Sequence, residues 1–291
     1  MAVAQSKTSP VSNTEGKQVD VDVFHIDQIP DAMDSMSWKV APQLMRHWFS
    51  LHPAEKWTTE RKNILLNADA RTLKPSEYND TIVKMDWALQ YHQVKEKINE
   101  GMKNWNSEGG INLLRERLFS QGYVLGRAFK LGYTRSAREL DATAQVNYVG
   151  VGSKLDTIND WFGAIGTANL KFALRGFTSV YERKNIFAVE AVGVYIKDTY
   201  DFVDRPDSTS EFLGIWGKSG VLSKFNMITH YLSLIQEQAY KELSKTYSGL
   251  VPIYNSDFRR WQDKHDSGGD FLVFSDVLWL HPLRGQEMIF L

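Results

Sequence analysis

Two aspartates flank a tyrosine at the end of an apolar, strand-like segment, and their types and spacing suit the binding of a metal cation. The segment runs from Val192 to Phe202. Asp198, Tyr200 and Asp201 lie at its end. A strand fixes the direction of its side chains and the following loop leaves coordination positions open, so these carboxylates could hold a hard cation such as Mg²⁺. Aspartate and tyrosine are also common where strands pass into turns, so a structural role stays open.

The geometry of a strand sets a condition on this site. Regular alternation places Asp198 and Tyr200 on the same face as Ile196. Asp201 points to the other face unless the turn begins there. We therefore expect a bulge or turn at Thr199 if both carboxylates are to meet one ion.

A second concentration of polar residues lies near the C-terminus, between Asn255 and Phe271. It contains His265 and the paired glycines Gly268 and Gly269, and it could build one wall of a pocket beside a strand. The alternative is structural, because Ser256 is a good helix N-cap and paired glycines commonly end a helix.

The elements that must position these residues change character along the chain. Apolar residues at helical spacing dominate the first 165 residues. We expect helices over residues 29–48, 76–99, 111–119 with a continuation toward 131, 135–144 and 155–165. Alternating residues from 168 onward, a charged turn at 182–185 and a second strand to 197 predict a long hairpin. A strand over 211–216, helices over 228–243 and 258–265, and a closing strand over 271–280 follow.

The predicted fold class is α+β, with a mostly helical N-terminal half and an antiparallel β-rich C-terminal half that carries one or two helices. Residues 1–22 are predicted to form a flexible tail, 23–165 a helical region and 166–291 a β-rich activity region. The two regions are compatible with a single domain.

Composition excludes several functional classes. The chain has 291 residues and is 43% hydrophobic, which is enough for a full core. Its formal net charge of -1 gives nucleic acid no general attraction, so we expect no nucleic-acid partner. Cysteine is absent, which removes disulfides, thiol nucleophiles and cysteine-bound zinc. We expect no transmembrane segment, and residues 1–18 lack the apolar run of a signal peptide.

The segment from Tyr195 to Phe202 resembles the active-site strand and turn of the colicin M family. These bacterial toxins hydrolyse lipid II at its phosphate linkage to the undecaprenyl carrier and need a divalent cation. Asp198, Tyr200 and Asp201 match the family's Asp-x-Tyr-Asp string.

The family's string is followed by a histidine or tyrosine and an arginine. Arg205 corresponds to the arginine. No histidine lies between Phe202 and Thr229, so His265 or His230 would have to replace it from elsewhere.

The resemblance implies a metal-dependent hydrolase with a role for each matched residue. Asp198 and Asp201 would bind Mg²⁺ or another divalent cation, or position water. Tyr200 would orient the phosphate, and Arg205 would stabilise developing negative charge.

A second resemblance covers more of the chain. Four segments of the chain carry it: residues 29–33, 44–49, 193–202 and 255–271. They resemble an uncharacterised proteobacterial family that is often encoded beside type VI secretion spike genes. This resemblance implies an antibacterial effector, made in the cytoplasm, secreted without a signal peptide and active in the target-cell periplasm. The implied partners are a spike or adaptor protein, a cognate immunity protein and a lipid-linked peptidoglycan precursor. The alternative is a non-catalytic adaptor of the secretion apparatus, with the helical half as its docking surface.

Overall fold

A computed structural model describes residues 24–206, 208–224, 227 and 249–291. The predicted tail over residues 1–22 and the predicted helix over 228–243 lie outside these ranges. Helices dominate the N-terminal half and an antiparallel-rich sheet dominates the C-terminal half, so the predicted α+β class is confirmed.

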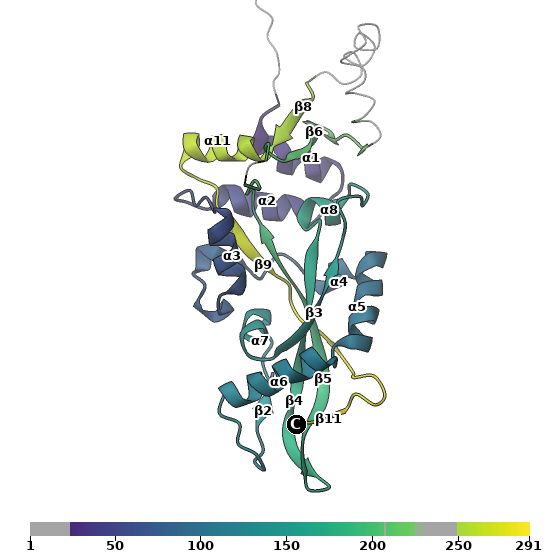
Figure 1. Cartoon of the computed structure of the whole chain (residues 1–291). Helices are drawn as coiled ribbons and strands as arrows, with labels where there is room; N and C mark the ends of the chain where they lie inside the picture. Colours follow the sequence, from purple (N-terminus) through teal and green to yellow (C-terminus); the bar gives the residue numbers. More distant parts are fainter. Residues whose placement is uncertain (1–23, 207, 225–226, 228–248) are drawn as a thin grey trace, which may run out of the picture.

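A long antiparallel hairpin forms the centre of the main sheet (Figure 1). It consists of β4 (Ala168–Tyr181) and β5 (Lys184–Tyr200). Glu182 and Arg183 connect the strands, and both have positive φ, as the tight hairpin turns that match strand twist require. The predicted hairpin is confirmed, and β5 extends three residues beyond the predicted end, to Tyr200.

The other strands pair around this hairpin or form a small second sheet. The main sheet also contains β1 (Tyr78–Asn79), β2 (Lys130–Leu131), β3 (Gln145–Val151), β9 (Phe271–Phe274), β10 (Leu278–Leu280) and β11 (Met288–Phe290). The second sheet contains β6 (Phe212–Gly217), β7 (Gly220–Val221) and β8 (Val251–Tyr254).

The helices lie along the sheet and across the end where β5 finishes (Figure 1). They are α1 (Ile29–Ser35), α2 (Ala41–Ser50), α3 (Thr59–Asn67), α4 (Met85–Ala88), α5 (His92–Asn104), α6 (Glu108–Ser120), α7 (Ala137–Thr143), α8 (Asp160–Ala164) and α11 (Asn255–His265). Short 3-10 turns occur at η1 (Ile26–Gln28), η2 (Ala70–Thr72) and η3 (Pro75–Glu77).

Several predicted boundaries are wrong for identifiable physical reasons. The helix predicted over 29–48 is two helices, because Ser37 has a positive φ and the chain restarts at α2. The carboxylate of Asp160 accepts hydrogen bonds from the N–H groups of residues 39, 40 and 41, so a side chain distant in sequence caps α2.

The helix predicted over 76–99 is also wrong, since this stretch contains η3, β1, α4 and the start of α5. Strand β3 was not predicted, α8 is shorter than residues 155–165, and the closing strand is divided into β9 and β10.

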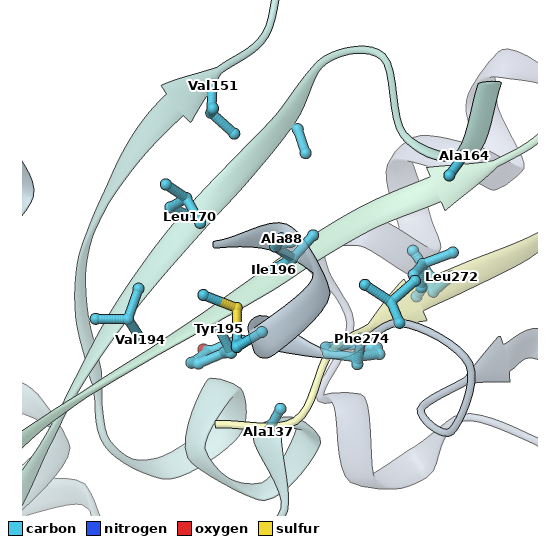
Figure 2. Packing of buried hydrophobic residues seen from close by; sticks show 14 of the residues in the cluster. Ala88, Ala137, Val151, Ala164, Leu170, Val194, Tyr195, Ile196, Leu272 and Phe274 are labelled. Atoms are coloured by element: carbon cyan, nitrogen blue, oxygen red, sulfur yellow. The ribbon is translucent and has the colours of Figure 1, made fainter. Parts of the chain in front are cut away.

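One cluster of buried side chains joins the N-terminal helices to the sheet. Figure 2 shows members of this cluster, among them Ala88 of α4, Ala137 of α7, and Tyr195 and Ile196 of β5. Residues 191–196 of β5 are buried on both faces, and this part of the strand is a continuous apolar run in the sequence. The core therefore holds β5 rigidly and fixes where its last residues lie.

Candidate functional site

The end of β5 is a regular strand up to Tyr200. Residues 197–200 pair in unbroken antiparallel register with residues 274–271 of β9. The bulge that two carboxylates need at Thr199 to meet one ion is therefore missing from this pairing. The alternation continues, with Asp198 and Tyr200 as members of one face.

Asp201 lies just beyond the strand and already has a cationic partner. Its Oδ2 atom accepts a hydrogen bond from Nζ of Lys62 at 2.7 Å, and only 6% of the Asp201 side chain is exposed. Its Oδ1 atom accepts a hydrogen bond from the Val203 N–H group at 3.0 Å, which starts the turn. Lys62 belongs to α3, so this ion pair ties the helix to the end of the strand.

Asp198 lies among protein groups, although part of the residue reaches solvent. Burial raises the pKa of its carboxyl well above the usual range, and the charge of Asp201 adds to this effect. The Thr199 N–H group and the charge of Lys62 lower the pKa of Asp198 and so oppose this shift. Asp198 is thus a carboxyl that tends to keep its proton, which suits a proton donor better than a metal ligand.

The Mg²⁺ site at Asp198 and Asp201 stays a prediction. Lys62 takes the position beside Asp201 Oδ2 that a cation would take. Within the described ranges, no group of three or more His, Cys, Asp and Glu side chains is arranged to hold a metal ion.

The other predicted site residues are Tyr200, Arg205 and His265. Tyr200 is buried, stacks on Phe271 with ring centroids 5.4 Å apart, and its burial raises the pKa of the phenol. Arg205 is exposed. His265 is exposed at the end of α11, where it stacks on Trp261. Among the described residues, no hydrogen bond or ion pair joins Arg205 or His265 to either carboxylate.

A cavity of about 290 Å³ opens directly after the end of β5. It lies between the start of α3, the segment after Asp201 and α11. Its wall is formed by Trp57, Thr58, Thr59, Phe202, Val203, Asp204, Pro206 and Arg259. Phe202 is fixed there because its ring stacks on that of Phe258 in α11, with centroids 3.6 Å apart.

Arg259 is the cation of this cavity and is held in one orientation. Its Nη2 atom donates to Oδ2 of Asp270 at 2.6 Å, its Nε atom to the Phe202 carbonyl and its Nη1 atom to Gln262. Asp270 is fully buried and also accepts hydrogen bonds from the Trp48 indole N–H group and the Trp57 backbone N–H group. Burial raises the pKa of Asp270, and Arg259 opposes this shift.

The start of α3 forms part of the wall of the same cavity, through Thr58 and Thr59. The Thr58 hydroxyl caps the N–H group of Arg61. The N–H groups of Thr59 and Glu60 have no such cap among the described residues, and they lie at the positive end of the helix dipole. The indole N–H group of Trp57 is buried and lacks a hydrogen-bond partner within the described part of the chain.

The cavity combines groups that recognise different parts of a ligand. The Arg259 guanidinium and the open turn of α3 suit an anion. The carboxylate of Asp204, which accepts from the Glu211 N–H group and the Asn255 side chain, suits a hydroxyl or amine donor. The rings of Trp57 and Phe202 offer apolar surface. A ligand that carries phosphate and hydroxyl groups on a ring fits all three.

Sequence reasoning found only part of this cavity. Arg259 and Asp270 lie in the C-terminal run that was expected to build one wall of a pocket. The opposite wall was missed because no helix was predicted between residues 48 and 76. Thr58 before the acidic residue Glu60 is a helix-start signal that predicts α3.

Comparison with known proteins places the chain in a family. The model of one protein family, described as a family of unknown function (DUF6402), matches residues 24–290. The chain belongs to this family. The DUF6402 match spans all described helices and strands, including both walls of the cavity. No curated protein and no solved structure matches the chain.

The DUF6402 match states no activity. The resemblances to the colicin M family and to proteins encoded beside secretion spike genes therefore stay predictions. Within the described ranges, no helix has the length and apolarity needed to cross a bilayer.

Proposed function

We propose that the cavity after β5 binds a phosphate-bearing sugar ligand of the bacterial envelope, and that the chain is an antibacterial effector acting on that ligand. The observation that carries the proposal is the joint presence of the Arg259 guanidinium and the start of α3 in opposite walls of one cavity. The colicin M resemblance of the adjoining segment supports a phosphate ester as the reacting group, and lipid II is the substrate it implies.

Hydrolysis of a phosphate ester adds water across the P–O bond. The water oxygen joins phosphorus, and a proton must reach the departing oxygen. A protonated Asp198 is suited to donate that proton. Asp198 lies four positions before Phe202, so a ligand anchored in the cavity must extend roughly 13 Å back along the chain to meet it. The proposal therefore calls for a long ligand, such as a sugar pyrophosphate, for the reaction itself.

Ligand binding is tested with a pair of matched variants at Thr59. This residue begins α3 and lines the cavity, and an acidic residue there is favourable for the helix. Thr59→Glu places a negative charge against the ligand, and Thr59→Gln adds similar bulk without charge. Isothermal titration with N-acetylglucosamine 1-phosphate should show binding to the wild type. We expect Thr59→Glu to bind roughly tenfold or more weakly and Thr59→Gln to stay close to wild type. Equal affinities of the two variants would contradict the anion site.

The effector role is tested in cells. The chain is expressed with and without an export signal, as wild type and as Asp198→Asn, while growth and lipid-linked peptidoglycan precursors are followed. We expect toxicity and precursor loss only for the exported wild type. Toxicity of a folded Asp198→Asn protein would exclude Asp198 from the reaction. Absence of toxicity in both compartments would favour the non-catalytic adaptor.

A further inference from the structure

The far end of the central hairpin exposes an unusual number of apolar side chains. We call this region the hairpin end and define it as residues 119–130, 177–186 and 288–290. More than half of the large exposed hydrophobic residues of the described chain lie in it: Phe119, Val124, Leu125, Phe177, Val180, Tyr181, Met288 and Phe290. Six of these, at positions 119, 124, 125, 180, 181 and 290, are 48–58% exposed. Such a concentration marks a surface that is covered in function.

These side chains are held on a rigid frame. The Asn185 side chain accepts a hydrogen bond from the Gly126 N–H group at 2.7 Å, which ties the 121–127 loop to the hairpin turn. The hydroxyl of buried Thr178 accepts from the Phe129 N–H group and donates to the Arg127 carbonyl, both at 2.7 Å. Val124 and Leu125 are therefore presented by a fixed loop fastened to the strands that carry the other exposed residues.

Cations surround this apolar surface. Arg127, Lys130, Arg183 and Lys184 are exposed, and none has a carboxylate partner among the described residues. Lys184 lies over the Phe290 ring. Glu182 is the acid in the same turn. The hairpin end is thus locally positive, although the chain as a whole has a net charge of -1.

We propose that the hairpin end docks onto the surface of a bilayer that contains anionic lipids. Two neighbouring turns project at this end, opposite α11 (Figure 1). A projecting apolar tip with surrounding cations suits the boundary between headgroups and acyl chains, where apolar side chains are buried and Lys and Arg meet anionic headgroups. Tyr181 has the amphipathic ring that is enriched at this boundary. A protein with an acidic, apolar face is the competing partner.

The proposal is independent of the cavity, which lies after the other end of β5. A strand of 17 residues spans roughly 50 Å. Docking through the hairpin end alone therefore leaves the cavity far from the docked bilayer.

The test uses the full chain and flotation with two kinds of vesicle, phosphatidylcholine alone and phosphatidylcholine with phosphatidylglycerol. We expect the wild type to float with the anionic vesicles, more weakly at high salt, and to stay unbound with the neutral ones. The double variant Val180→Ser/Tyr181→Ser should bind the anionic vesicles roughly tenfold or more weakly. Arg183→Gln and Lys184→Gln should each weaken binding to the anionic vesicles about fivefold.

Leu155→Ser is the matched control, because Leu155 is 89% exposed but lies in the loop between β3 and α8. It should bind as the wild type does. Circular dichroism confirms that each variant is folded, and runs without vesicles exclude self-association. Failure of the folded wild type to bind anionic vesicles overturns the proposal and favours a protein partner. Equal loss in the control and the double variant overturns it as well.

Discussion

The two ends of β5 differ in which side chains are buried and which are exposed. At the cavity end, a buried carboxylate, Asp270, is matched by an arginine and two N–H donors. At the hairpin end, apolar side chains face solvent and cations lack carboxylate partners among the described residues. A buried charge is tolerated only when its partners are in place, and an exposed apolar surface is tolerated when a partner covers it. Under the two proposals, one strand connects two separate binding sites.

The largest expected effect comes from breaking the buried network. Asp270→Ala leaves Arg259 and the Trp48 indole N–H group without their shared acceptor. We expect the free energy of unfolding to fall by about 3–5 kcal/mol in urea denaturation. Asp263→Ala is the control, since this α11 residue pairs with Lys56 on the surface and 67% of its side chain is exposed. The free energy of unfolding of Asp263→Ala should fall by less than about 1 kcal/mol. Similar losses in the two variants would show that the cavity end does not depend on this network.

The corresponding change at the hairpin end removes the hydroxyl that ties down the loop. Thr178→Val deletes the acceptor of the Phe129 N–H group and the donor to the Arg127 carbonyl at a fully buried position. We expect a loss of about 1–3 kcal/mol in the free energy of unfolding. Vesicle binding should also weaken because Val124 and Leu125 are no longer held beside the hairpin. Thr178→Ser retains the hydroxyl and should keep vesicle binding, which separates the hydrogen bonds from the methyl group.

Replacing Asp198 at the cavity end should have a smaller, pH-dependent effect on the free energy of unfolding. Its pKa is raised in the folded state, so above about pH 4 the unfolded chain loses this proton while the folded chain keeps it. The folded state then binds more protons, and the free energy of unfolding falls as pH rises toward the folded pKa. Asp198→Asn removes this loss, so the variant should be more stable than wild type at pH 7. The difference should vanish below about pH 4. Urea midpoints across this range provide the measurement, and a less stable variant at pH 7 would contradict the assignment.

The smallest effect on folding is expected at the tip of the hairpin. Val180 is 52% exposed, so Val180→Ser should change the free energy of unfolding by no more than about 0.5 kcal/mol. Thermal unfolding monitored by circular dichroism measures this change. A large loss would mean that Val180 contributes to the core, and the interpretation of the hairpin end as a docking surface would then be wrong.

The fold was predictable where local pattern and packing agree. Helices α6, α7 and α11 and the β4–β5 hairpin follow from periodicity and turn residues. The break between α1 and α2 could not be predicted from local pattern, because its cap comes from Asp160, more than a hundred residues away. Strand β3 is stabilised by pairing with β4. The short sequence from Gln145 to Val151 does not predict this pairing.

In the candidate sites too, residues close together in sequence were predicted and partners distant in sequence were missed. Asp198 and Asp201 were found because they lie only three positions apart in the sequence, and the run that carries Arg259 was found because its polar residues are also close together. Their distant partners were missed: Lys62 and Thr59 reach the end of β5 only through the packing of α3. The hairpin end was missed because its cations come from two separated segments, around Arg127 and around Arg183, and no single Lys/Arg block exists in the sequence.

The two proposed sites bind independently, but their separation along β5 has a geometric consequence. If the hairpin end docks on a bilayer, the cavity lies roughly 50 Å along the strand, and a phosphate at the headgroup level of that bilayer is out of reach. The ligand of the cavity would then be a water-soluble sugar phosphate or one carried by another surface. Precursor loss in cells together with vesicle docking would require the chain to lie along the bilayer.

The central claim is that the two ends bind different partners independently, and one crossed measurement tests it most directly. Thr59→Glu and Val180→Ser/Tyr181→Ser are each assayed for binding to N-acetylglucosamine 1-phosphate and to anionic vesicles. We predict that Thr59→Glu loses the sugar phosphate and keeps the vesicles, whereas the double variant loses the vesicles and keeps the sugar phosphate. Loss of both activities in either folded variant would contradict two separate sites.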